Sequence, residues 1–431
     1  MARAVRVDAV VVGAGLAGLA CANDLCDAGL EVMLLESSYR VGGRMVSDPQ
    51  DGFLLDRGFQ VFNTAYPQVR RRVDLRALRL RAFDPGFVLA RADGSVLVGD
   101  PTRQRGVLPG LLRLGSARDL AALAAFSARD MLAPVGLLKG GREVTARQAL
   151  TRAGLSDGFS DEVLAPFLRG VFLDRELTVS GRFFHLVWRS MLRGTLCLPE
   201  RGVGQVPRQL ADRLPAGVLR LRSPVERLGD DGVLLARGRE VHAPAVVVAT
   251  GPTAAGSLLP HLPPVPVRPV TTLYHAAPAP PWTAKQLLVD GEGPLLHSCV
   301  VSNVQPAYAP VGTALISTSL LGTASPEQIG LAERRLAALY RTSLRSWERI
   351  AVHHVPEALP ALPASAPLSN TTRLAPGRYV CGDHRATASV QGALASGSRA
   401  ARAVLRDLGA VRRLNREPAS DIPRETGSSF I

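Results

Sequence analysis

The stretch that decides the fold is VDAVVVGAGLAGLACANDLCDAGLEVMLLE, residues 7–36. Its first part, 7–12, is a short β-branched run that predicts a buried strand, and the Ala/Leu-rich stretch 16–28 predicts a helix that ends at Gly29. Residues 31–36 are a second short apolar run. Because a strand, helix and strand in about thirty residues have the size of a βαβ crossover, the two strands are expected to lie side by side and parallel.

The turn between the first strand and the helix carries a G-x-G-x-x-G pattern, and Glu36 ends the second strand. The first glycine permits a tight turn, the second lets a pyrophosphate approach the backbone, and the third allows close helix–strand packing. The helix start offers unpaired N–H groups to phosphates. Glu36 suits both hydroxyls of an adenosine ribose and disfavours NADP, but this pattern does not separate FAD from NAD. The predicted binding turn comprises Gly13, Ala14, Gly15, Leu16, Ala17 and Gly18.

Residues 36–44, ESSYRVGGR, resemble the E-x-x-x-x-x-G-G-R segment of the FAD-dependent amine oxidase and phytoene desaturase-like superfamily. The resemblance implies FAD as the cofactor, with Gly42, Gly43 and Arg44 along its diphosphate and near the flavin. Glycine pairs allow a close backbone passage, and a guanidinium pairs readily with phosphate oxygens. Three further segments resemble the same family: 52–67, 198–210 and 381–401.

The resemblance also assigns residues from the later parts of the chain. It implies that Val225 meets the adenine end through its backbone, and that Gly382 and Asp383 lie near the ribityl–diphosphate chain. A plain turn with an Asp helix cap is the alternative for that pair. The helix predicted over 389–408 would aim its positive end at the flavin pyrimidine edge. The residues implied at that edge are Gln391, Gly392 and Ala393.

The βαβ rhythm does not continue along the chain. It disappears between about residues 57 and 195, where helix-like stretches such as 117–132 alternate with polar loops, and alternating apolar segments after residue 281 suggest an antiparallel sheet. We therefore predict an α/β protein with a Rossmann-like FAD-binding domain and an interleaved α+β substrate domain. The predicted FAD-binding parts are 1–60, 197–260 and 370–410, the substrate parts are 61–196 (mostly helical) and 261–369 (antiparallel sheet plus helix), and 411–431 is a flexible tail.

Charge and composition narrow the class of partner. Basic residues exceed acidic ones by 51 − 37 = 14, almost entirely as scattered arginine, and no nucleic-acid motif accompanies them. A basic amphipathic helix near 110–139 allows contact with anionic lipid, although packing on its own domain is preferred. Five widely spaced cysteines predict neither disulfides nor a metal site and fit a cytoplasmic protein. Oligomeric state is not indicated.

The substrate leaves fewer signals than the cofactor. A flavin takes a hydride at N5, so the protein needs no obligatory catalytic triad. Family members that oxidise amines place a lysine near N5, but Lys139 and Lys285, the only lysines, match no such segment, and no aromatic cage is evident. His384 and Arg385 are the predicted catalytic side chains, and Phe59 and Gln60 are predicted to face a small-molecule substrate.

Four functions stay open at this point. The resemblance makes dehydrogenation of an amine the first hypothesis, with an isoprenoid or other apolar substrate as the second. The missing lysine and cage keep a non-catalytic flavin-binding scaffold as a third. A plain NAD-dependent dehydrogenase is the weakest, because Gly42, Gly43 and Arg44 would then lack a purpose.

Overall fold

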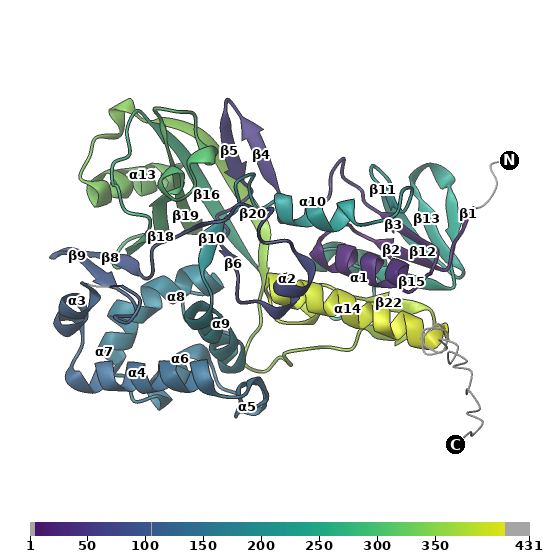
Figure 1. The fold of residues 1–431 in the computed structure, drawn as a ribbon, viewed down its shortest axis with the longest axis horizontal. Helices are drawn as coiled ribbons and strands as arrows, with labels where there is room; N and C mark the ends of the chain where they lie inside the picture. Colours follow the sequence, from purple (N-terminus) through teal and green to yellow (C-terminus); the bar gives the residue numbers. More distant parts are fainter. Residues whose placement is uncertain (1–4, 105, 410–431) are drawn as a thin grey trace, which may run out of the picture.

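The computed structural model describes residues 5–104 and 106–409. Figure 1 shows a six-stranded sheet with its helices on one side of the molecule, and a seven-stranded sheet with a group of helices on the other. Several long segments of the chain run between the two. The predicted flexible tail, 411–431, lies outside the described residues.

The six-stranded sheet is built on the predicted βαβ unit. The two predicted strands pair in parallel, with Ala9 opposite Val32 and Val12 opposite Leu35, as the pattern of residues 7–36 requires. Later segments of the chain add three more parallel strands and one antiparallel edge strand. In spatial order the strands are β11 (Leu219–Arg220), β3 (Val32–Leu35), β2 (Ala9–Val12), β15 (Ala245–Val248), β22 (Arg378–Val380) and β21 (Arg373–Ala375).

This sheet is buried on both faces, which explains its continuous apolar strands. Ala9 and Val11 face a core that includes helices α1 (Leu16–Asp27), α10 (Gln205–Asp212) and α14 (Val390–Asp407). Val10 and Val12 face the opposite way, onto a second, four-stranded sheet. That sheet has the order β1 (Val5–Arg6), β14 (Glu240–His242), β13 (Gly232–Leu235) and β12 (Val225–Gly229).

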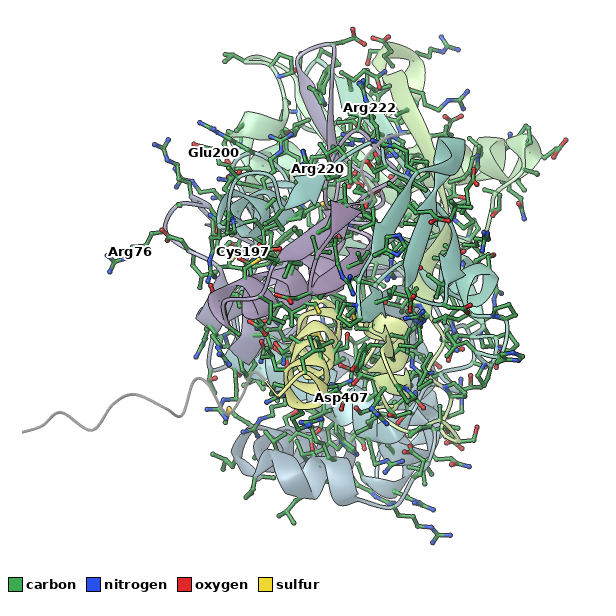
Figure 2. The ribbon with its side chains drawn as sticks, turned by 90° about the vertical axis from the view of Figure 1, so that its right-hand side faces the viewer. Arg76, Cys197, Glu200, Arg220, Arg222 and Asp407 are labelled. Atoms are coloured by element: carbon green, nitrogen blue, oxygen red, sulfur yellow. The ribbon has the colours of Figure 1, made fainter. Side chains whose placement is uncertain are left out.

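Helix α14 is fixed at its carboxyl end and packed closely against α1. Asp407, labelled in Figure 2 at the carboxyl end of the helix, accepts hydrogen bonds from the Tyr379 hydroxyl (2.5 Å) and from Nε of Arg373 (2.6 Å). In the helix, a Cβ atom on Gly397 would lie 2.1 Å from the carbonyl oxygen of Ala17. The absence of a side chain at Gly397 therefore lets α14 lie directly against α1.

The seven-stranded sheet has the order β20 (Glu348–Pro360), β16 (Val267–Ala277), β19 (Ala314–Leu321), β18 (Leu295–Val300), β17 (Leu287–Asp290), β8 (Phe87–Arg91) and β9 (Gly94–Val98). Its neighbours are antiparallel except β17 and β8. Helix α13 (Pro326–Tyr340) packs on one face through Ile329, Ala332 and Leu336. The sequence pattern predicts a helix over 326–347. Its start is confirmed, but the predicted end is wrong, because the left-handed Arg341 (φ +51°) ends the helix after Tyr340.

The helical group is made mainly from residues 107–193. The single helix expected near 110–139 is wrong: three helices occupy the region, separated at Gly115 and at Pro134. The middle one packs on its own domain through Phe126, whose ring stacks on Phe184 at 5.6 Å between centroids. The helices are α3 (Val107–Leu114), α4 (Ala117–Leu132), α5 (Val135–Gly140), α6 (Ala146–Arg152), α7 (Asp157–Phe159), a π-helical turn (Ser160–Leu164), α8 (Ala165–Phe172) and α9 (Gly181–Arg193).

Shorter elements connect these bodies. A three-stranded sheet of order β6 (Phe62–Asn63), β10 (Leu196–Leu198), β7 (Arg81–Ala82) and a hairpin of β4 (Ser47–Gln50) with β5 (Phe53–Asp56) lie between the two large sheets. The remaining helices are α2 (Pro67–Arg72), α11 (Pro252–Leu258) and α12 (Val301–Val304). Among the described residues no helix is both long enough and apolar enough to cross a bilayer.

Candidate functional site

One large cavity, of about 800 Å³, runs between the six-stranded sheet and the seven-stranded sheet. Residues that follow four parallel strands, β2, β3, β15 and β22, line one part of it, so this part opens at the carboxyl ends of the strands. Ligands of open α/β sheets bind at this edge. We call this part of the lining the dinucleotide half; it includes Gly13, Gly15, Glu36, Gly42, Gly43, Arg44, Val225, Gly251, Gly382 and Asp383.

The glycines of the first turn have distinct structural reasons. Gly13 has a φ of +102°, a conformation that side-chain-bearing residues rarely adopt. A Cβ atom on Gly18 would lie 1.9 Å from the carbonyl oxygen of Gly13, so Gly18 is required by packing alone. Gly15 has an ordinary φ of −75° and nothing within 4 Å of a Cβ position. The fold does not require glycine at residue 15, whereas a ligand passing over the turn would.

Glu36 lies at the carboxyl end of β3 with its carboxylate directed at the turn. Its Oε2 accepts a hydrogen bond from the backbone N–H of Ala14, and its Oε1 accepts one from that of Ser38, both at 2.8 Å. The side chain lines the cavity, and so does Val225, at the start of β12. A carboxylate held in this place is available to sugar hydroxyls on its cavity side.

The second glycine segment lies against the first. Gly42 donates its N–H to the carbonyl of Ala14 at 2.9 Å, and both Gly42 and Gly43 have positive φ angles, +123° and +58°. A Cβ atom on Gly43 would lie 3.5 Å from Cα of Gly15. The two predicted segments therefore form one continuous glycine-lined wall of the cavity.

Arg44 and Asp383, 339 residues apart in the chain, form an ion pair of 2.5 Å. Arg44 also donates to the carbonyl of Ala358 at 3.1 Å. Burial alone would lower the pKa of the Arg44 guanidinium, but the charge and hydrogen bond of Asp383 outweigh it and raise that pKa. The beginning and end of the chain thus meet in the cavity wall, with a fixed positive charge beside the glycines.

Helix α14 directs its amino end at the cavity. The side chain of Ser389 caps the helix by accepting from the N–H of Gly392 at 3.1 Å, and Ser389, Val390 and Ala393 line the cavity. Gln391 and Gly392 do not line it. Gln391 instead accepts a hydrogen bond from the N–H of Gln68 at 2.9 Å, and a Cβ atom on Gly392 would lie 1.8 Å from the carbonyl oxygen of Thr387.

The two predicted catalytic residues, His384 and Arg385, are buried and are not among the residues that line the cavity. Burial lowers the pKa of His384 to about 4, and neither of its ring nitrogens has a partner among the described residues. Arg385 donates to the carbonyl of Thr371 at 2.8 Å, and Thr371 does not line the cavity either. Their catalytic role stays a prediction.

The two predicted substrate residues, Phe59 and Gln60, both line the cavity. The ring centroid of Phe59 lies 4.7 Å from that of His297. The side-chain amide of Gln60 donates a hydrogen bond to the carbonyl oxygen of Arg44 at 2.8 Å. Gln60 therefore stabilises the segment that contains Gly42 and Gly43. Phe59 is therefore the better placed of the two to face a substrate.

Apart from Phe59, the sequence reasoning missed the rest of the lining, which we call the apolar half. It comes mainly from helices α8 and α9 and from strands β16 to β20, with Phe59 and Val61 from the loop before β6 and Leu196 from β10, and residue patterns give no sign that these elements converge. A histidine inside the mostly apolar run 295–300, LLHSCV, was the one available signal. The apolar half comprises Phe59, Val61, Phe167, Gly170, Val171, Phe172, Leu173, Phe183, Val187, Met191, Leu196, Val270, Leu287, Val289, Leu296, His297, Ser319, Val355 and Leu359.

Charge is distributed unevenly over the cavity. Its acidic lining residues, Glu36, Glu226, Glu357 and Asp383, are on or beside the dinucleotide half, where Glu357 lies near the Arg44 charge. None of the residues of the apolar half is an Asp, Glu, Lys or Arg, but Glu357 lines the cavity on β20 between Val355 and Leu359, and Arg57 lines it two residues before Phe59. Neither of the chain's two lysines lines the cavity. Among the described residues, no group of His, Cys, Asp and Glu side chains is arranged to hold a metal ion.

Comparison with known proteins identifies relatives of this arrangement. The model of the family of flavin containing amine oxidoreductases matches residues 16–405. Polyamine oxidase 3 of Oryza sativa subsp. japonica is 52% identical over 50 residues, which are 12% of this chain and 10% of that protein. Coproporphyrinogen III oxidase of Propionibacterium freudenreichii is 29% identical over 314 residues and 59% of each chain. The chain thus spans between a tenth and three fifths of the length of these two relatives.

Solved structures share the fold over nearly the whole chain. An oxidoreductase from Methanosarcina mazei superimposes with a TM-score of 0.71 at 18% identity, covering 91% of this chain and 99% of that one. Cyclohexylamine oxidase from Brevibacterium oxydans superimposes with a TM-score of 0.67 at 18% identity, covering 94% and 99%. At this identity the likeness establishes the fold, including the α/β architecture predicted from residues 7–36.

Proposed function

Because this chain belongs to the family of flavin-containing amine oxidoreductases, we propose that it is an FAD-dependent oxidoreductase that dehydrogenates an organic substrate. The observation that carries the proposal is the continuity of the cavity. One lining includes Gly15, the amino end of α14 and the apolar half. A cofactor with its phosphates on the first turn would reach the other two without leaving the cavity.

The residues present fit FAD. The open space over Gly15, beside the start of α1, suits a diphosphate, because free N–H groups and the positive end of a helix favour phosphate oxygens. Glu36 suits the adenosine ribose, and its charge would repel a 2′-phosphate. The amino end of α14 is placed to stabilise negative charge on a ring system. When bound, FAD supplies a hydride acceptor, while the chain binds, orients and shields the substrate.

The apolar half supports an apolar substrate, at least around the bond that is oxidised. It offers no carboxylate to a protonated amine and no charged group to a carboxylate. Burying an unpaired charge there would be costly. An uncharged organic molecule therefore fits the lining best, as in the hypothesis of an isoprenoid or other apolar substrate.

An amine is the second candidate, and the family match favours it. The aromatic rings of Phe172 and Phe183 meet edge to face at 5.6 Å, and Tyr66 lies in the wall, so rings are available around an amine. Glu357, the carboxylate that lines the cavity between Val355 and Leu359, already lies near the Arg44 charge, so an amine bound away from it would bind as its uncharged free base.

Two measurements test the proposed function. The purified protein should show a flavin absorption band, and the cofactor released by heat should have the mass of FAD. Absence of the band, together with failure to bind added FAD, would contradict the proposal. Anaerobic bleaching of the band by an apolar polyene or by an aliphatic amine then separates the two substrate classes, and bleaching by neither favours a flavin-binding scaffold without turnover.

A further inference from the structure

His297 is a buried polar side chain in the apolar half. It lies on β18, in which all six residues are buried, and only 8% of His297 is exposed. The side chain is part of the cavity lining, yet its Nε2 has no hydrogen-bond partner among the described residues. A buried nitrogen left unpaired costs about 1–3 kcal/mol. Nε2 itself has almost no accessible surface in the free protein, so it is left unpaired there, and a ligand supplies a partner only when the ring turns this edge toward the cavity.

A β-bulge directs His297 to the cavity. Strand β18 pairs with β19 through Leu295 and Leu320, and next through His297 and Ser319, so Leu296 is an extra residue on β18. As a result two consecutive residues, Leu296 and His297, both line the cavity. Bulges commonly re-aim side chains in this way beside binding sites.

The surroundings hold the imidazole ring in place. Phe59 packs on it with 4.7 Å between ring centroids and a tilt of 57°. On α8, a Cβ atom at Gly170 would lie 3.1 Å from Nδ1 of His297, closer than most such contacts. Glycine at residue 170 thus leaves the ring room on its helix-facing side, and Phe59 limits its movement on another.

Nearby amides that line the cavity are already engaged. Asn63 donates to the carbonyl of Ser190 at 3.0 Å and accepts from the N–H of Ala65 at 2.8 Å. Gln60 donates to the carbonyls of Arg44 and Arg57. Nε2 of His297 differs from these groups because no described residue satisfies it.

The chemistry of the ring limits its role. Burial lowers the pKa of His297 to about 4, so the imidazole is uncharged near neutral pH. An uncharged imidazole has one donor and one acceptor nitrogen. It is a poor proton acceptor at this pKa, so it is suited to hydrogen bonding rather than to removing a proton from the substrate.

We propose that His297 determines substrate specificity by hydrogen-bonding one uncharged polar group, a hydroxyl, carbonyl or N–H, on an otherwise apolar substrate. This inference rests on the proposed function and narrows its substrate class. The rest of the apolar half would bind the hydrocarbon part, and a charged group would find no partner there. A substrate whose polar group lies at the wrong distance from its hydrocarbon part would leave Nε2 of His297 unpaired and would therefore bind less tightly.

The test uses the FAD-loaded protein and two probes that differ by one terminal hydroxyl group, 2-phenylethanol and ethylbenzene. Their dissociation constants are read from perturbation of the flavin absorption band. We expect His297→Phe to weaken binding of the alcohol about tenfold, as loss of one buried hydrogen bond implies, and to leave ethylbenzene binding unchanged. His297→Gln, which keeps a donor and an acceptor, should retain most of the alcohol affinity.

The control is Leu296→Met, a volume-conserving change at the adjacent lining residue, which should alter binding of both probes alike. Equal effects of His297→Phe on the two probes, or no effect on either, would overturn the inference. A second measurement needs no variant: the ring ¹⁵N resonances of His297 in the native protein should shift with 2-phenylethanol and not with ethylbenzene. The same response to both probes would also overturn it.

The two levels of the proposal fail separately. A protein that carries no flavin and binds none contradicts the proposed function. A protein with a normal flavin band whose His297 does not distinguish the two probes contradicts only the role of His297.

Discussion

Alanine at Gly15 and alanine at Gly18 should have opposite effects, although both glycines belong to one motif. A Cβ atom on Gly15 meets nothing within 4 Å, and its φ of −75° suits alanine. Gly15→Ala should therefore change the stability of the free protein by no more than about 1 kcal/mol, since the gain from restricting the unfolded chain opposes the loss of a preferred N-cap residue of α1. The new methyl group, however, would occupy the proposed path of the diphosphate.

Gly18→Ala places its Cβ atom 1.9 Å from the carbonyl oxygen of Gly13 and 3.2 Å from Cβ of Ala249. The first neighbour is backbone and cannot rotate away, so helix α1 must move. Such overpacking costs about 1–3 kcal/mol or more. The variant should therefore unfold at a lower urea concentration even without cofactor.

The assay is urea unfolding of each variant with and without added FAD. A ligand that binds only the folded state stabilises it by an amount set by its concentration relative to Kd, so tenfold weaker binding removes about 1.4 kcal/mol of that gain. Gly15→Ala should lose at least this much of the FAD-dependent gain, while its stability without FAD stays within about 1 kcal/mol of the wild type. Gly256→Ala, in α11 with nothing within 4 Å and outside the cavity lining, is the matched control for both quantities.

Two results would refute the reasoning. If Gly15→Ala gained as much stability from FAD as the wild type, no ligand would pass over that glycine. If Gly15→Ala and Gly18→Ala were equally unstable without FAD, the assignment of one glycine to ligand approach and the other to packing would be wrong.

Three further predictions concern single residues. Glu36→Ala should weaken FAD binding by about 10- to 100-fold, the value of a hydrogen bond to a charged group, measured by fluorescence titration; unchanged binding would contradict its place at the ribose. Gly397→Ala should lower the free energy of unfolding by about 1–3 kcal/mol, because its Cβ would lie 2.1 Å from the carbonyl oxygen of Ala17. A urea midpoint equal to that of the wild type would show that α1 and α14 can separate without cost. Burial raises the pKa of Asp56 from 3.8 to about 6, so the folded state keeps a proton that the unfolded chain loses, and stability falls as the pH rises through that window. Asp56→Asn should remove this loss, so its free energy of unfolding relative to the wild type should rise by up to about 3 kcal/mol between pH 4 and pH 7.5. A difference in unfolding free energy that does not change with pH would contradict this prediction.

The sequence alone was sufficient for the parts of the fold that depend on local rules. The strand, turn, helix and strand of residues 7–36 follow from β-branched runs, glycine and helix-forming residues, and the structure confirms their parallel pairing. Helix α4 has the same bounds as the predicted stretch, 117–132, because a capping box at Ser116 starts it. Proximity of Arg44 and Asp383 came from resemblance, since no local pattern relates residues 339 positions apart.

Other features depend on tertiary packing and left no local pattern. The end of α13 at Tyr340 requires Arg341 in a left-handed conformation, which is uncommon for arginine and which no propensity scale favours. The side chain of Gln391 accepts a hydrogen bond from Gln68, on helix α2, which is far from Gln391 in the sequence but adjacent to it in the structure. Exposure of His297 to the cavity depends on a bulge set by the pairing of β18 with β19. Each outcome was decided by contacts between elements.

The division of the cavity separates affinity for the cofactor from choice of substrate. The dinucleotide half draws its lining from turns after parallel strands, and these turns are fixed by the fold itself, as the 1.9 Å contact at Gly18 illustrates. The apolar half draws its lining mainly from α8, α9 and the seven-stranded sheet, which contribute mostly side chains. Side chains there can change without moving the backbone that would hold FAD. Substitutions such as those at His297 should therefore alter which substrate reduces the flavin while leaving flavin content unchanged, whereas substitutions in the first turn should alter both together.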